Sequence, residues 1–152
     1  MPAHAHARME PADHEPVGEV LSTRTQRIWL RRDGIVQTAN YDSQQGEGGG
    51  IVPIDLACAK ENVAAVIAVS AGKRRPVYVD QQVSLPLTSE AQQHYASDEM
   101  ARATTAVGIL ADSWIGRLLG NFVLRYKKGG VPTRLFQTEA EAVHWLKGYL
   151  QP

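Results

Sequence analysis

Polar side chains that could act as an acid, a base or a nucleophile follow two apolar runs of the sequence. Asp80 ends the first run, and Asp112 with Ser113 follows the second. In open α/β sheets the carboxyl ends of the strands form the edge at which ligands bind, and Ser89 lies shortly after the first of these ends. We therefore expect a candidate strand-edge polar site formed by Asp80, Ser89, Asp112 and Ser113.

Catalysis at this edge would be hydrolysis, with Ser113 as the nucleophile and Asp80 as an acidic partner. Ser113 lacks the Gly-x-Ser-x-Gly elbow of such enzymes, and no histidine lies near it in the sequence to activate it. The structural alternative gives Asp112 and Ser113 a helix-capping role and has Asp80 accept N–H bonds in a turn. We predict that the protein is not an enzyme.

The sequence does not indicate a metal or cofactor site. Cys58 is the single cysteine, which excludes zinc sites built on several thiolates. His4, His6 and His14 lie in a segment that supplies neither the geometry nor the supporting hydrogen bonds of a selective metal site. The glycines within residues 46–50 lack the Lys-Ser/Thr pair of a phosphate-binding loop. We expect neither a metal nor a cofactor.

A different kind of chemistry is indicated between Ser113 and Thr138, where there is no acidic residue. The run Trp114–Tyr126 is apolar almost all round a helix, and basic residues lie at its end and beyond it. Such a segment favours contact with an acidic protein surface, a second copy of the chain, an anionic ligand or an anionic membrane surface. The alternative is a solvated helix end whose dipole the cations complement. The candidate interaction residues are Trp114, Arg117, Leu118, Phe122, Arg125, Lys127, Lys128 and Arg134.

The charge and length of the chain limit the classes of partner and compartment. Sixteen lysines and arginines balance sixteen acids in 152 residues, so no nucleic-acid partner is expected from the overall charge. The N-terminus lacks the pattern of a secretion signal, and no apolar run reaches the length of about 18 residues that a membrane span needs. A single cysteine fits a reducing compartment. We expect one cytoplasmic domain.

Residues 1–22 are predicted to form a disordered tail, because they contain three prolines and alternating His and Ala but no regularly spaced large apolar residues. Removing them is expected to leave the stability almost unchanged. The domain then covers residues 23–152. It opens with a hairpin whose turn contains Asp33-Gly34, and a glycine-rich mobile loop follows over residues 42–50.

From residue 55 onward, apolar periods typical of helices alternate with short apolar runs typical of buried strands. The second helix is expected to break at Ser97. This order predicts an α/β fold with right-handed crossovers, a mostly parallel or mixed sheet of four to five strands, and about four helices. The predicted strands are 27–32, 35–41, 76–80, 106–111 and 131–136, and the predicted helices are 55–71, 89–103, 113–126 and 138–150.

Several stretches of the sequence together form a recognisable pattern. The stretches are Pro76–Asp80, Tyr95–Ser97, Ala103–Leu110, Gly116–Arg117, Gly120–Phe122, Val131–Phe136, Glu141–Ala142 and Trp145–Leu146. The pattern resembles the bacterial STAS/SpoIIAA-like proteins of uncharacterised type over about residues 26–150. The resemblance implies a sheet of four to five strands with helices beside it, as in anti-sigma-factor antagonists and transporter STAS domains.

The resemblance also bears on Ser89. Anti-sigma-factor antagonists carry a phosphorylatable serine after an aspartate, at the start of the helix that follows the central strand. Aligned without gaps from Asp80, that pair falls on Thr88 and Ser89, but a Glu-Ala-Gln sequence replaces the family's Ser-Gly-Leu continuation. This departure argues against a phosphorylation switch at Ser89.

The resemblance and the residues together favour one function over another. The family works mainly through protein contacts, and the sequence contains no recognisable nucleophile or proton-transfer group. We therefore predict a non-enzymatic regulatory or protein–protein interaction module. The alternative is a domain that binds a small or lipid-like ligand in an apolar pocket between the Trp114–Tyr126 helix and the sheet, with basic residues at its mouth. A closed core would favour the module, and an enclosed apolar cavity of a few hundred cubic ångströms would favour the ligand-binding domain.

Overall fold

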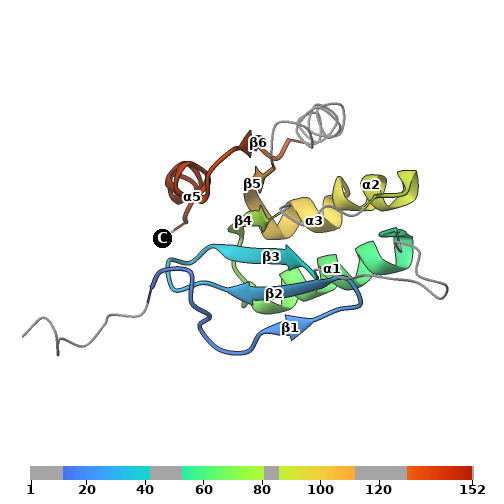
Figure 1. Cartoon of the computed structure of the whole chain (residues 1–152), viewed down its shortest axis with the longest axis horizontal. Coiled ribbons are helices and arrows are strands. Elements are labelled where there is room, and N and C mark those ends of the chain that lie inside the picture. The colour runs from blue at the N-terminus through green and yellow to red at the C-terminus, as the bar shows by residue number, and fades with distance from the viewer. Residues whose placement is uncertain (1–11, 42–52, 81–85, 112–129, 152) are drawn as a thin grey trace, which may run out of the picture.

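A computed structural model of the chain describes residues 12–41, 53–80, 86–111 and 130–151. These residues form one six-stranded sheet with helices beside it (Figure 1). The strands are β1 Leu21–Ser22, β2 Gln26–Leu30, β3 Val36–Asn40, β4 Arg75–Asp80, β5 Thr104–Leu110 and β6 Thr133–Phe136, and the helices are α1 Leu56–Val69, α2 Ser89–Tyr95, α3 Asp98–Ala103 and α5 Glu139–Lys147.

The strands lie in the sheet in the order in which they occur in the chain. The pairs β1–β2 and β2–β3 are antiparallel, whereas β3, β4, β5 and β6 are parallel neighbours. The predicted α/β class and mixed sheet are therefore confirmed. The sheet has one strand more than the four to five predicted, because β1 lies in the segment that we expected to be a disordered tail.

The hairpin of β2 and β3 forms where the sequence predicted it. Gly34 has a φ of 90°, a left-handed conformation that costs glycine little. The Asp33 carboxylate accepts a hydrogen bond from the backbone N–H of Ile35 at 3.2 Å, which fixes the start of the return strand. Ile28 then pairs with Thr38 across the hairpin.

Residues 12–22 are not a disordered tail, and this part of the expectation is corrected. Leu21 pairs with Ile28 of β2, and the Val17 N–H donates to the Leu30 carbonyl at 2.8 Å. The indole N–H of Trp29 donates to the His14 carbonyl at 2.9 Å. Without this segment β2 would be an edge strand with unpaired backbone groups, and pairing satisfies those groups although the segment has little apolar content. Residues 1–11 lie outside the described residues.

Both faces of the sheet are covered, but by different elements. Crossovers between parallel strands are right-handed in nearly all proteins, so successive crossovers in one direction place their helices on one face. The helices α1 and α3 contact β2 and β5, and α5, which follows the last strand, contacts β4, β5 and β6 on the opposite face (Figure 1). In the described part of the chain α5 is the helix on this face, and its nine residues cover only part of it.

Side-chain caps fix where the helices begin. The Asp55 carboxylate accepts from the Cys58 N–H at 2.9 Å, and this backbone hydrogen bond lowers the pKa of Asp55. Thr138 caps α5 by accepting from the Glu141 N–H, and Thr138 with Glu141 has the spacing of a capping box. The predicted helix 89–103 is interrupted at Ser97, which confirms the expected break, and α3 begins after it.

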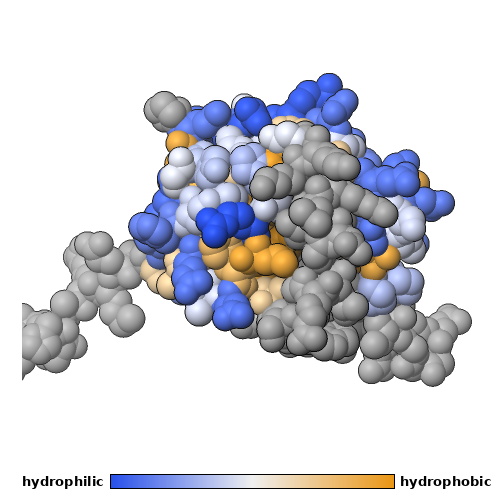
Figure 2. Space-filling view, turned by 90° about the horizontal axis from the view of Figure 1, so that it is seen from above, coloured by the Kyte–Doolittle hydropathy of each residue, from blue (hydrophilic) through white to orange (hydrophobic). Residues whose placement is uncertain are grey.

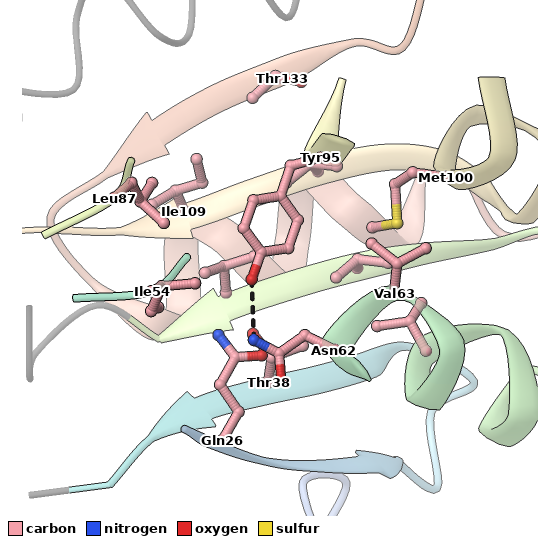
Figure 3. Close-up of a pocket in the computed structure, with 14 residues that line it drawn as sticks. Gln26, Thr38, Ile54, Asn62, Val63, Leu87, Tyr95, Met100, Ile109 and Thr133 are labelled. Carbon is pink, nitrogen blue, oxygen red and sulfur yellow. Dashed lines mark hydrogen bonds between the residues drawn. The ribbon is translucent and has the colours of Figure 1, made fainter. Parts of the chain in front are cut away.

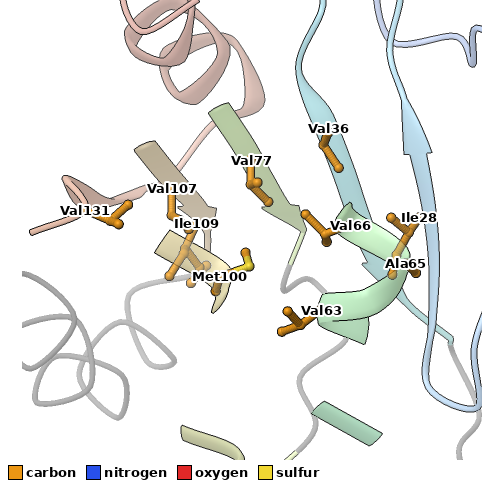
Figure 4. Close-up of a cluster of buried hydrophobic side chains, with 11 residues drawn as sticks. Ile28, Val36, Val63, Ala65, Val66, Val77, Met100, Val107, Ile109 and Val131 are labelled. Carbon is orange, nitrogen blue, oxygen red and sulfur yellow. The ribbon is translucent and has the colours of Figure 1, made fainter. Parts of the chain in front are cut away.

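Two hydrophobic clusters lie on the two faces of β4 and β5. Val77 and Val107 face α1 and α3, in a cluster that includes Val63 and Met100 (Figure 4). Tyr78 belongs to the second cluster, which packs under α5. The alternation of side chains along a strand explains why neighbours in the sequence enter different clusters.

Glycine at position 108 allows α5 to approach the sheet closely. A Cβ atom at Gly108 would lie 3.0 Å from Cδ1 of Leu146, a buried residue of α5. A larger residue at this position would require the Leu146 side chain to shift by a few tenths of an ångström or more. The predicted helix 113–126 and the predicted mobile loop 42–50 lie outside the described residues.

Candidate functional site

One predicted interaction residue, Arg134, lies in the described part of the chain, on the last strand of the sheet. Arg134 is exposed, and its guanidinium carbon lies 5.3 Å from the centre of the Phe136 ring and 5.7 Å from that of Trp145. The rings of Trp145 and Tyr149 follow at a centroid distance of 4.9 Å. We call Arg134, Phe136, Trp145 and Tyr149 the β6–α5 surface.

The local sequence explains why these four residues meet. Arg134 and Phe136 are two residues apart on β6 and therefore point to the same face of the sheet, the face that α5 covers. Trp145 lies on α5 and Tyr149 in the turn that follows the helix, and this turn brings the two rings together at the end of α5. Leu146 is fully buried against the sheet, which leaves Trp145 and Tyr149 half-buried at the rim.

The guanidinium group of Arg134 is available to bind a carboxylate of another molecule. Among the described residues Arg134 forms no ion pair, and its contacts are with aromatic rings. Arginine packed flat on an aromatic ring keeps the N–H groups at its edge available to a carboxylate. The remaining predicted interaction residues fall outside the described residues; they are Trp114, Arg117, Leu118, Phe122, Arg125, Lys127 and Lys128.

The predicted strand-edge polar site does not come together as one site. Asp80 ends β4, is half-buried and lines a cleft on the α5 face of the sheet. Ser89 is the exposed first residue of α2, on a helix that packs against α1 on the opposite face. The cap of α2 is Thr88, whose hydroxyl accepts from the Ala91 N–H.

The two faces of the sheet explain the separation of Asp80 from Ser89. The chain crosses from the strand to a helix on the other face between these residues, so a short distance in sequence does not bring their side chains together. Asp112 and Ser113, the other two members of the predicted site, lie outside the described residues.

An apolar cavity lies between α1, α2, α3 and the sheet (Figure 3). Val63, Met100 and Ile109 form part of its wall, and the side chains of Asn62 and Tyr95 point toward one another across it. Its volume is about 60 Å³. Pockets for drug-sized ligands have volumes of about 300–1,000 Å³, so this cavity has room only for water or a very small molecule.

A buried hydrogen-bond network forms the polar part of the cavity. The Asn62 side chain is 1% exposed; its amide nitrogen donates to the Thr25 hydroxyl at 3.0 Å and to the Tyr95 hydroxyl at 2.8 Å. Its carbonyl oxygen accepts from the Thr23 hydroxyl at 2.6 Å. Burial raises the pKa of Tyr95 to about 12, and the hydrogen bond from Asn62 offsets a part of this increase. The network therefore joins α1 to α2 and to the segment before β2.

Sequence reasoning missed a second buried polar group, around Arg31. The Arg31 side chain is 3% exposed and donates two hydrogen bonds to the Asp33 carboxylate, at 3.2 and 3.0 Å. It also donates to Gln37 at 3.0 Å and to Glu139 at 3.3 Å, and it lies 5.7 Å from the centre of the Tyr78 ring. The Asp33-Gly34 turn was visible in the sequence, but nothing in the sequence indicated that Arg31 would be buried beside it.

Metal sites and membrane-spanning helices are absent from the described residues. No group of three or more His, Cys, Asp or Glu side chains in this part of the chain is arranged to hold a metal ion. None of its helices is both long and apolar enough to cross a membrane. Cys58 is buried on α1, and burial raises the pKa of its thiol.

Comparison with known proteins gives one match. No curated protein and no solved structure matches the chain. The sequence model of a domain of unknown function, DUF7793, matches residues 28–150. This range contains every described helix and strand except β1 and the first two residues of β2. The chain therefore belongs to the DUF7793 family.

Proposed function

We propose that this domain is a non-enzymatic regulatory module of the STAS/SpoIIAA-like type that acts by binding another protein through the β6–α5 surface. One observation carries the proposal: an exposed arginine lies on a row of aromatic rings and has no carboxylate partner among the described residues. Arg, Trp and Tyr are the residue types that contribute most binding energy at protein interfaces.

The chemistry of Arg134 defines the partner as a protein with an acidic residue that is accessible to a guanidinium. A carboxylate can accept two parallel hydrogen bonds from arginine, and a nearby apolar side chain can cover the rim of Trp145 and Tyr149. Figure 2 shows hydrophobic residues grouped among hydrophilic ones on the face that it views. The sequence suggested an acidic protein surface as one possible partner, and we propose that Arg134 binds such a surface.

The volume of the apolar cavity weighs against the alternative function. At about 60 Å³ it is far smaller than the few hundred cubic ångströms that we set as the criterion for a small-molecule or lipid-like ligand. The pocket expected from the sequence would lie against residues 114–126, outside the described residues, so this cavity is not that pocket. The preference for the interaction module rests on the β6–α5 surface.

A charge reversal tests the proposed surface. The wild-type chain and an Arg134→Glu variant would each be immobilised and exposed to a lysate of the source cells, and bound proteins would be quantified by mass spectrometry. We expect at least one protein to bind the wild-type chain and to be depleted at least about tenfold on the variant, because charge repulsion replaces a paired contact. The protein so identified would then be purified and its affinity measured by calorimetry.

Arg27→Glu is the matched control, since Arg27 is also an exposed strand arginine but lies on β2 near the other end of the sheet. Circular dichroism would establish that both variants fold. The proposal fails if the Arg134→Glu and wild-type chains retain the same proteins in the same amounts. It also fails if Arg27→Glu causes the same loss, because binding would then depend on net charge alone.

A further inference from the structure

A pocket with basic side chains in its wall lies between the C-terminal end of α1 and α3, beside the amino ends of β4 and β5. We call it the amino-edge pocket, and the residues of its wall that matter here are Ile67, Lys73, Arg74, Glu99 and Arg102. Its volume is about 290 Å³, close to the lower limit of about 300 Å³ for small-ligand sites. The pocket is therefore large enough for a compact organic molecule.

The ends of two helices bring these side chains together. After the last residue of α1, Ala71 and Gly72 adopt left-handed φ angles of 55° and 78°, which end the helix and turn the chain toward β4. Lys73 and Arg74 follow this turn directly. Arg102 lies in the last turn of α3, a helix that packs against α1. Three cations thus border one pocket.

The backbone holds Arg74 in place at the wall. One terminal guanidinium nitrogen, Nη2, donates to the Thr104 carbonyl at 3.0 Å and to the Ala101 carbonyl at 3.4 Å. The other two guanidinium nitrogens form no hydrogen bond within the described part of the chain. Because one nitrogen is anchored, the remaining donors lose little conformational freedom when they bind an acceptor.

Lys73 and Arg102 are exposed, and neither forms an ion pair among the described residues. The acid in the wall is Glu99, which is 52% exposed and lies 3.9 Å from His94 Nε2. A structural role for Arg102 is to complement the dipole of α3 at its C-terminal end. That role does not occupy its hydrogen-bond donors, so they remain available to a ligand.

The sequence of the remaining stretches does not supply acids to this edge of the sheet. Residues 113–129, which precede the amino end of β6, contain no acidic residue, and residues 81–85 carry no charge. Asp112 follows the carboxyl end of β5, and residues 42–52 follow the carboxyl end of β3, at the other edge of the sheet. Residues 1–11 contain one acid and one arginine. The pocket is therefore expected to attract an anion.

We propose that the amino-edge pocket binds a phosphate monoester with a small apolar organic group. A phosphate group has three terminal oxygens, one for each of Lys73, Arg74 and Arg102, whereas a carboxylate has two. The organic group covers Ile67, an apolar side chain that is 37% exposed although it lines the pocket. This site lies away from the β6–α5 surface and does not depend on the function proposed for that surface.

Phenyl phosphate is the probe that tests the site, because it joins a phosphate to one apolar ring. A ligand of this size binds in the micromolar to millimolar range, so the titration extends into the millimolar range at low salt. Two-dimensional NMR would follow the backbone amides. We expect saturable shifts of Ile67, Gly72 and Arg102, and none with benzyl alcohol, which lacks the phosphate. Inorganic phosphate and benzoate should each bind at least about threefold more weakly.

Three variants separate the charges from the apolar wall. Arg102→Gln and Lys73→Gln change exposed side chains and should each weaken phenyl phosphate binding at least about fivefold. Ile67→Ala should weaken it to the affinity of inorganic phosphate while leaving inorganic phosphate itself unaffected. Lys60→Gln is the matched control, since Lys60 is an exposed lysine in the first half of α1 and outside the pocket. Circular dichroism would establish that every variant folds.

The absence of saturable shifts with phenyl phosphate would overturn the proposal. Equal affinity for inorganic phosphate would identify free phosphate as the ligand, and equal affinity for benzoate would identify a carboxylate; either result contradicts a phosphate ester. An equal loss in Lys60→Gln would mean that net charge alone attracts the probe, and unchanged affinity in Arg102→Gln and Lys73→Gln would place the probe elsewhere. None of these measurements involves Arg134→Glu, so the two proposals fail separately.

Discussion

At the scale of single residues, polar side chains inside the protein determine which surfaces can function. Asn62 and Arg31 are almost fully buried, and each satisfies its hydrogen-bonding groups within the fold. Tyr78 is equally buried, and the Arg31 guanidinium lies 5.7 Å from the centre of its ring. These satisfied networks stabilise the fold, and exposed polar residues such as Arg134 remain as candidates for contacts with other molecules.

The hydroxyl of Tyr95 predicts a pH dependence of stability. Its pKa is raised from 10 to about 12 by burial, so the fold favours the neutral form. This contribution is therefore complete below pH 10 and is lost as the pH rises through 12. We expect Tyr95→Phe to flatten the fall in unfolding free energy between these two values, measured by urea denaturation at a series of pH values.

An ultraviolet titration of phenolate formation gives an independent measurement. Burial raises the pKa of both Tyr78 and Tyr95, so Tyr95→Phe should show one late-titrating tyrosine fewer than the folded wild-type chain. Asn62 keeps its hydrogen bond to Thr25 in this variant, so the fold should survive the substitution. Identical titration curves for the two proteins would show that Tyr95 is not protected from ionisation.

At the scale of elements, the sequence predicted helices and strands well where apolar spacing and caps agreed. Thr138 and the capping-box glutamate placed the start of α5, and the continuous apolar runs placed β4 and β5. It failed for β1, because a two-residue strand is held by backbone pairing to β2 and has no apolar pattern of its own. Pairing of this kind depends on what the partner strand leaves exposed, which local sequence does not encode.

The same pairing predicts that the N-terminal segment contributes to stability. Deleting residues 1–22 removes β1 and the hydrogen bonds from Val17 to Leu30 and from Trp29 to His14. At about 1 kcal/mol for each hydrogen bond, the melting temperature should fall by at least about 4 °C. A deletion of residues 1–11 alone is the control. The difference in melting temperature between the two truncated chains measures the contribution of residues 12–22 to stability. Equal melting temperatures would support the tail predicted from the sequence.

At the scale of the whole molecule, the order of strands explains where the cleft beside Tyr78 and the β6–α5 surface lie. Successive crossovers place α1 and α3 on one face, and the other face is left to α5 and to residues 12–17. The cleft lined by Tyr78 and Asp80 opens on that second face, and the β6–α5 surface lies where α5 meets the last strand. Alternating strands and helices predicted the fold class, but which face would remain partly open followed only from the three-dimensional arrangement.

The two hydrophobic clusters share β4 and β5, so damage to one should destabilise the other. Leu146 is fully buried under α5 and fits against Gly108. We expect Leu146→Ala to lower the free energy of unfolding by about 2–4 kcal/mol, whereas Leu150→Ala, which is already 37% exposed, should change it little.

Native-state hydrogen exchange tests whether the two clusters unfold together. If the domain is one cooperative unit, the slowest amides of α1 should lose as much protection in Leu146→Ala as those of β4, although α1 lies on the opposite face of the sheet. Retention of full protection in α1 would mean that α5 detaches by itself. The β6–α5 surface would then belong to a locally unfolding element, and a protein bound there should restore the protection of α5 by binding only its docked form.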